Sequence, residues 1–137
     1  IELMAGGVVQ FGDELDALVE PRKPGFAFEM GAMGSPENNF YRDAYTRQGY
    51  GDLAQEVLKL WLERRRDEAA ALIPDEFVIA SNLLGTEEQV KERIRVYRDA
   101  GITILQVSPS GETMQERLNT LGRFVDLFNA VNTEVSE

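Results

Sequence analysis

The chemistry open to this chain is limited first by residue types that it lacks. Its 137 residues include no histidine and no cysteine. A Ser-His-Asp triad, a thiolate nucleophile and a zinc site made of the usual ligands therefore cannot be built from this chain alone. We predict that the chain holds no metal site.

One polar segment lies where ligands commonly bind. The residues Ser108-Pro109-Ser110-Gly111 follow a short run that is predicted to be a strand. Ligands of parallel α/β folds lie beyond the carboxyl ends of the strands, so this segment is a candidate for binding. The alternative is an ordinary strand-to-helix turn, because these residue types are common in turns.

The helix and strand before this segment are clearly marked. Thr86 with Gln89 three residues later forms a predicted capping box, and an apolar stripe at helical spacing follows. Gly101 is placed to end this helix in a left-handed conformation. Residues 102–107 are β-rich and uncharged, which is typical of a strand buried on both faces of a parallel sheet. The residues of the stripe are Val90, Ile94, Tyr97 and Ala100.

A second strand-helix unit is predicted at the start of the chain. Residues 2–11 form a β-rich run, Gly12 or Asp13 is the predicted cap, and a helix with Leu15, Leu18 and Val19 on one face follows. We expect strands 2–11 and 102–107 to be adjacent and parallel. Two strands make a small sheet, and the chain begins inside one of them, so we expect further strands N-terminal to this segment.

The tract between the two units is predicted to be helical and broken by prolines and glycines. The predicted helices cover residues 26–33, 38–49, 52–66 with Asp52 as cap, 68–73 with Asp67 as cap, and 75–84. A final helix is predicted over residues 112–131, after the last strand.

Two features of these helices suggest binding, but each has a simpler explanation. The Arg64-Arg65-Arg66 run is more typical of a solvated helix end than of an anion site. Phe124 with Phe128, in the final helix, is more typical of core than of a cofactor box.

These elements predict an α/β fold in which helix dominates and two strands are parallel. We treat residues 1–137 as a single segment with four parts. The parts are a strand and helix (1–20), a helical crossover subdomain (21–85), a helix, strand and closing helix (86–131), and a polar tail with little reason to be ordered (132–137).

Charge and hydropathy narrow the range of partners. The chain carries 24 acidic and 14 basic side chains, a formal net charge of −10, which repels nucleic acid and anionic lipid surfaces. No run approaches the roughly 20 apolar residues that a membrane span needs, and no signal segment is visible. We therefore expect no nucleic-acid partner, no membrane partner and a cytoplasmic location.

Four stretches resemble the C-terminal part of the luciferase-like oxidoreductases that use a flavin or a deazaflavin. They are IELMAGGVVQFGDELD, MGAMGSPENNFYRDAYTRQGYGD, RRRDEAAALIPDEFV and LLGTEEQVKERIRVYRDAGITILQVSP, in this order. NFY with the following RQGYGD is most similar to the members that use coenzyme F-420, a deazaflavin. The resemblance implies the C-terminal portion of a (β/α)8 TIM barrel, with this chain supplying the seventh and eighth strands. A whole barrel needs about 250 residues.

The resemblance also implies a function and a set of residues that contact the cofactor. The intact protein would transfer a hydride between coenzyme F-420 and an organic substrate, with the redox chemistry belonging to the cofactor and no residue of this chain required as a catalyst. Gly6, Gly7 and Ser108, near the strand ends, would contact the cofactor. The alternative for the glycines is that they only turn the chain.

On the substrate side, the resemblance points to the loop of residues 31–41. Met33 offers adaptable apolar contact, while Asn39 and Tyr41 offer hydrogen bonds that orient a polar small molecule. Tyr41 is also a possible proton donor, a weaker role because its ordinary pKa is near 10. The structural alternatives are a helix cap for Asn39 and a core position for Tyr41.

Two other functions stay open at this point. The first is the same barrel with FMN and molecular oxygen, a monooxygenase, because the residues that choose the cofactor would lie upstream. The second is a non-catalytic module that binds a partner. We expect the fragment alone to be inactive and to pair with the missing N-terminal part of the barrel or with further copies of itself through exposed strand edges, making a homo-oligomer.

Overall fold

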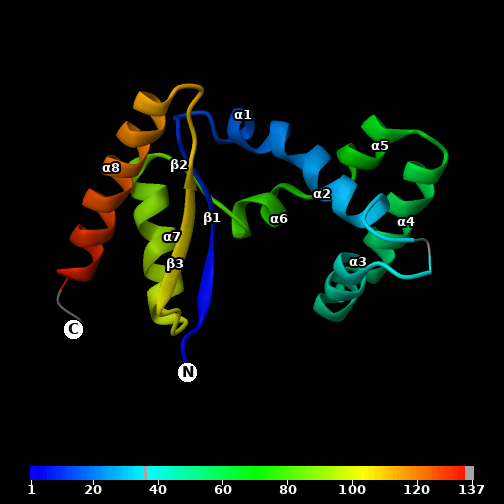
Figure 1. The fold of residues 1–137 in the computed structure, drawn as a ribbon, viewed down its shortest axis with the longest axis horizontal. Coiled ribbons are helices and arrows are strands. Elements are labelled where there is room, and N and C mark those ends of the chain that lie inside the picture. The colour runs from blue at the N-terminus through cyan, green and yellow to red at the C-terminus, as the bar shows by residue number, and fades with distance from the viewer. Residues whose placement is uncertain (36, 135–137) are drawn as a thin grey trace. The chain divides into compact units, whose positions relative to one another are not determined.

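The computed structural model describes residues 1–35 and 37–134, which form two compact units. The sheet unit comprises Ile1–Leu18 and Ile79–Glu137, and the helical unit comprises Val19–Val78. Figure 1 labels the helices and strands of both units. Each unit has its own core.

Three parallel strands form the sheet unit's centre. They are β1 (Met4–Phe11), β2 (Leu83–Gly85) and β3 (Ile104–Pro109), in the order β2-β1-β3. The expectation that the first and last of these strands are adjacent and parallel is confirmed, with Gly6 opposite Gln106 and Val8 opposite Ser108. The short helix α1 (Leu15–Val19) follows β1.

The count of two strands was wrong, because β2 was predicted to be the end of a helix. Helix α6 (Asp75–Ala80) stops earlier than residue 84. Asn82 then accepts a hydrogen bond from the Val8 backbone N–H at 3.0 Å, and Leu83 pairs with Val9. Tertiary pairing with β1 thus overrides the local helical pattern. In a run of successive barrel strands β2 would lie between β1 and β3, so the position of this chain in a barrel stays a prediction.

Two helices cover one face of the sheet. Helices α7 (Glu87–Asp99) and α8 (Met114–Asn132) both start with capping boxes, at Thr86 and Thr113. They bury an apolar cluster against the strands, and burial of such side chains is the main favourable term in folding. The cluster comprises Val9, Leu83, Val90, Ile94, Phe124 and Val131.

Strand β3 is not buried on both faces as predicted. Its residues alternate between exposed and half-buried, because it is an edge strand covered by helices on one face only. The expected disordered tail also differs, since Asn132 ends α8 and Glu134 pairs with Arg95 at 2.8 Å. Residues 135–137 lie outside the described residues.

The helical unit contains short helices separated by sharp turns. Asp52 and Asp67 do not cap helices as predicted, because each helix begins earlier: Tyr50 and Arg65 occupy the cap positions, and neither makes a side-chain cap bond. Gly49, at φ 94°, makes the kink that starts the first of them early. The elements are η1 (Glu20–Arg22), α2 (Lys23–Gly31), α3 (Phe40–Tyr45), η2 (Thr46–Tyr50), α4 (Gly51–Leu62) and α5 (Arg66–Ala71).

Arg64 and Arg65 lie in the turn between α4 and α5, and Arg66 is the first residue of α5, so the three arginines do not end a helix. Arg64 has a positive φ of 63°, Arg65 pairs with Glu63 and Glu68, and Arg66 lies 4.9 Å from the Trp61 ring centroid. The guanidinium groups of Arg65 and Arg66 therefore have partners in the turn or in the helices next to it, which supports the structural interpretation over an anion site.

Candidate functional site

The carboxyl ends of β1 and β2 meet at one edge of the sheet, since the strands are parallel. A hollow of about 300 Å³ opens there. The guanidinium of Arg123, from α8, lies 4.1 Å from the Phe11 ring centroid and 3.1 Å from a Glu87 carboxylate oxygen. The hollow is lined by Phe11, Gly12, Asp13, Thr86, Glu87 and Arg123.

This hollow is poorly suited to an anion. Its one guanidinium is already paired with Glu87, and Asp13 adds a second carboxylate. The hydroxyl of Thr86 accepts the Gln89 backbone N–H at 3.3 Å and so is used in capping α7. The balance of charge is negative, so the hollow does not provide the cations that a phosphate group usually binds.

The predicted cofactor residues Gly6 and Gly7 have local structural reasons to be glycine. A Cβ at Gly6 would lie 1.8 Å from the Gln106 carbonyl oxygen, and a Cβ at Gly7 would lie 2.2 Å from the Ser81 carbonyl oxygen. Both distances are shorter than atoms tolerate, so each glycine allows a neighbouring backbone to approach closely. Contact of these glycines with a cofactor stays a prediction.

Ser108 lies on the sheet face that α7 and α8 leave open. Its register partner is Val8, and Gly6 pairs with Gln106 two residues away, so these four positions share one face. The side chains of Ser108 and Gln106 are exposed and uncharged. At these positions the open face presents a hydroxyl and an amide, and no cation for a phosphate.

Asn39 is built into the helical unit. It is 2% exposed, its Oδ1 accepts the Arg42 backbone N–H at 3.0 Å, and its Nδ2 donates to the carbonyl oxygens of Glu29 and Met30 at 2.9 and 3.3 Å. The alternative that Asn39 caps a helix is therefore what the structure shows, at the start of α3. A contact between Asn39 and a substrate stays a prediction.

Met33 and Tyr41 lie at the two ends of the same loop. Met33 is half-buried, and its backbone N–H donates to the Phe28 carbonyl at 3.3 Å. Tyr41 is 40% exposed, so it is not a core residue, and its ring centroid lies 6.1 Å from that of Phe40, which is 76% exposed. The structure thus places Met33, Asn39 and Tyr41 in the helical unit and the predicted cofactor residues in the sheet unit.

Two polar residues near this loop were missed by sequence reasoning. Arg42 is buried and donates to the carbonyl oxygens of Met30 and Ser35. Tyr45 donates to the Glu29 carboxylate at 2.5 Å, and burial together with this bond raises the pKa of Tyr45 well above its usual range. A tyrosine with a raised pKa is a poor proton donor, so this pair is structural. The helical spacing of Asn39, Arg42 and Tyr45 was the available signal.

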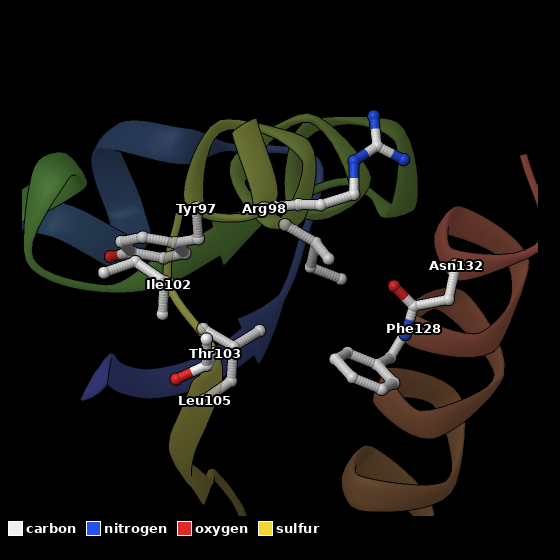
Figure 2. A pocket seen from close by; sticks show the side chains of 8 residues that line it. Tyr97, Arg98, Ile102, Thr103, Leu105, Phe128 and Asn132 are labelled. Atoms are coloured by element: carbon white, nitrogen blue, oxygen red, sulfur yellow. The ribbon is translucent and has the colours of Figure 1, made fainter. Parts of the chain in front are cut away.

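A second hollow, of about 170 Å³, lies at the opposite end of β3. Figure 2 shows Phe128 and Asn132 of α8 facing Thr103 and Leu105, while the guanidinium of Arg98 points away. Arg98 donates to the Val131 carbonyl oxygen at 3.1 Å, and the Tyr97 hydroxyl donates to the Ala80 carbonyl oxygen at 3.2 Å. This second hollow lies at the amino ends of the strands, whereas parallel α/β folds bind ligands at the carboxyl ends.

Metal ligation and membrane insertion can be checked over residues 1–35 and 37–134. Within these residues, no group of three or more histidine, cysteine, aspartate or glutamate side chains is arranged to hold a metal ion. Within the same residues, no helix is both long enough and apolar enough to span a bilayer.

Comparison with known proteins adds independent information. Residues 1–103 match the profile of the luciferase-like monooxygenase family. A Mycobacterium tuberculosis protein named "Putative coenzyme F-420-dependent oxidoreductase" is 38% identical over 116 residues, which are 85% of this chain and 33% of that protein. The chain therefore spans about a third of the length of that relative. No solved structure matches the chain.

Proposed function

The chain belongs to the luciferase-like monooxygenase family, and we propose that it is part of an oxidoreductase that transfers a hydride between coenzyme F-420 and a small organic substrate. The observation that carries this proposal is the 38% identity to the mycobacterial relative, whose name refers to the same coenzyme. The bound deazaflavin would supply the hydride chemistry, as redox cofactors generally do. The residues of this chain would bind the deazaflavin and the substrate and orient them toward each other.

The open face of the sheet supports the cofactor part of the proposal. Gly6 and Ser108 lie on this face, beside an exposed Gln106 amide, and could support a planar ring and bond to its edge. Gly7 points to the other face, against the Ser81 carbonyl oxygen, so it would serve the cofactor by fixing the position of β1. Because Gly6, Gln106 and Ser108 carry no charge, cations for the phosphate would have to come from other residues.

The loop in the helical unit supports the substrate part. Met33 and Tyr41 would contact the substrate with a flexible thioether and a phenol, while the buried Asn39 would hold the loop in place. None of these side chains needs to exchange a proton for the reaction to proceed. Tyr41 as proton donor remains the weaker form of the proposal, since its hydroxyl ordinarily titrates near 10.

An FMN-dependent monooxygenase is the second candidate, favoured by the description of the family itself. A binding titration separates the two. The intact protein that contains this chain would be titrated with coenzyme F-420 and, separately, with FMN, following the fluorescence of each. Selective binding of F-420 supports the proposal, selective binding of FMN supports the second candidate, and binding of neither supports a non-catalytic module.

We also propose that the sheet is completed by other polypeptide, either the rest of a longer protein or a second copy. Large apolar side chains are exposed on or beside its strands, and unpaired strand edges recruit partners. We expect residues 1–137 alone to be inactive and to self-associate; a monomer in sedimentation at micromolar concentration would contradict this. The exposed residues are Ile1, Leu3, Met4 and Ile104.

A further inference from the structure

We infer that Arg42 is a positioning residue, which holds the loop of residues 32–39 against the C-terminal end of α2 and thereby fixes Met33 relative to Tyr41. The significance of those two residues rests on the proposed function. The mechanical part of the inference does not, because all the groups involved lie in the helical unit.

The guanidinium of Arg42 joins two parts of the chain. It is 5% exposed, and its Nη1 donates to the Met30 carbonyl oxygen at 3.4 Å while its Nη2 donates to the Ser35 carbonyl oxygen at 3.0 Å. Met30 is in the last turn of α2, where free carbonyl groups and the helix dipole favour a cation. The Arg42 guanidinium thus connects the end of α2 to Ser35 in the loop that follows α2.

The backbone of Arg42 is held by the same loop. Its N–H donates to Asn39 Oδ1 at 3.0 Å, and Asn39 Nδ2 donates to the carbonyl oxygens of Glu29 and Met30 in α2. Helix α3 therefore begins at a residue that is itself tied to α2. Loss of the Arg42 side chain would remove the bond between the Ser35 carbonyl oxygen and a side chain of α3, and would leave the Met30 carbonyl oxygen with the 3.3 Å bond from Asn39.

Hydrogen bonds also join Ser35 and Asn38 within the loop. The Ser35 N–H donates to the Asn38 carbonyl at 2.9 Å, and the Asn38 N–H donates to Ser35 Oγ at 2.9 Å. Gly34 has a φ of 90°, and a Cβ there would lie 2.3 Å from the Asn38 carbonyl oxygen. The side chains of Arg42 and Asn39 then connect this part of the chain to the end of α2.

A lysine at position 42 should hold the loop less firmly than Arg42 does. A guanidinium presents several N–H groups in a fixed fork that can reach two carbonyl groups at once, whereas an ammonium is a single point of charge. Methionine has a similar length and no donor. The series Arg, Lys, Met at position 42 therefore separates the loss of the fork from the loss of charge and volume.

A spin-label distance measurement tests the inference directly, because the chain contains no cysteine that would need to be removed. Glu37 in the loop and Gln55 in α4 are both exposed, so Glu37→Cys and Gln55→Cys can carry nitroxides. The distance distribution would be compared in residues 1–137 with Arg42, with Arg42→Lys and with Arg42→Met, each diluted with an excess of unlabelled chain so that distances between copies do not contribute. Arg47→Met, the same change at an exposed arginine, is the matched control.

We expect Arg42→Met to broaden the distribution at least about twofold, Arg42→Lys to give an intermediate width, and Arg47→Met to leave it unchanged. Unfolding of the helical unit by Arg42→Met would be detected by the emission of Trp61, the single tryptophan. In that case, the comparison of Arg42→Lys with the unchanged chain provides the test. An unchanged width in both Arg42 variants, or equal broadening in Arg47→Met, would overturn the inference. Failure of the intact protein to bind F-420 would overturn the proposed function alone.

Discussion

Each unit of this chain has an apolar core, but the two units differ in the polar side chains that are buried beside it. The core of the sheet unit is an apolar cluster packed between the strands and helices α7 and α8. In the helical unit, Lys23, Asn39 and Arg42 are buried polar residues that tie short helices and loops together. Lys23 lies 2.6 Å from both Glu20 and Asp75.

This difference matters for function. Apolar cores tolerate only well-fitted shapes but have no preferred direction, whereas buried hydrogen bonds fix the position of particular backbone groups. The sheet unit therefore suits a scaffold that presents a flat face, and the helical unit suits a loop whose side chains must be held in register. The predictions below test this contrast.

The largest effect is expected in the apolar cluster of the sheet unit. Ile94→Ala should lower the free energy of unfolding by about 2–5 kcal/mol, because it removes buried methyl groups and leaves a cavity. Urea unfolding followed by circular dichroism measures the loss. Val96→Ala, two residues away and exposed, is the control and should change stability by less than about 0.5 kcal/mol. Equal effects of the two changes would show that the cluster is not the core.

The next effect concerns Asn39 in the helical unit. Asn39→Ala removes a cap, takes the Nδ2 donor from the Glu29 carbonyl group and leaves the Met30 carbonyl group with the 3.4 Å bond from Arg42, so it should cost about 1–3 kcal/mol. Urea unfolding followed by Trp61 fluorescence reports on this unit. Asn39→Asp keeps the cap acceptor but turns a carboxylate oxygen toward the two carbonyl oxygens in a buried site, so it should not recover the loss. A neutral Asn39→Ala would mean that the loop is held without this side chain.

A pair of glycine substitutions should have opposite signs. Gly6→Ala places a Cβ against the Gln106 carbonyl oxygen and should cost more than about 1 kcal/mol. Gly122→Ala, in α8 with no atom within 4 Å of the new Cβ, should stabilise the protein by about 0.5–1 kcal/mol because alanine favours helix. Thermal melting of the two variants measures both. A tolerated Gly6→Ala would indicate that β1 and β3 can separate at this pair.

The smallest effect is a pH dependence at the start of α8. The backbone N–H groups of Thr113 and Glu112 donate to the Glu116 carboxylate at 3.0 and 2.7 Å and hold its pKa below the ordinary value. The stability from this depressed pKa is present above the unfolded pKa, about 4.3, and is lost as pH falls through the folded pKa. Melting curves from neutral pH to about pH 3 should show a shallower acid decline for Glu116→Gln. Identical profiles would remove this carboxylate from the account.

Local patterns predicted much of the sheet unit. The Thr86–Gln89 capping box and the left-handed Gly101, at φ 88°, are confirmed because they depend on residues only a few positions apart. Strand β2 was missed because three residues are too few to show an alternating pattern, and its position depends on a bond between Asn82 and Val8, 74 residues away.

The candidate site was less predictable from sequence. Asn39 carried a recognisable cap signal, but its burial depends on Glu29 and Met30, nine or ten residues earlier. Arg42 carried no signal beyond its spacing from Asn39, since an arginine in a short helix is usually exposed. Tyr41 was considered as a core residue, yet it points to solvent while Tyr45, one turn later, pairs with Glu29.

The most direct test of the account is the affinity of the intact protein for coenzyme F-420 in two variants, one from each unit. Ser108→Leu changes the open sheet face, and Tyr41→Phe removes a hydroxyl from the loop. Fluorescence titration should show that Ser108→Leu raises the F-420 dissociation constant at least about tenfold, a change of about 1.4 kcal/mol, while Tyr41→Phe leaves it within about twofold. Equal dissociation constants in the wild type and Ser108→Leu, or a larger loss in Tyr41→Phe, would contradict the assignment of the cofactor to the sheet unit.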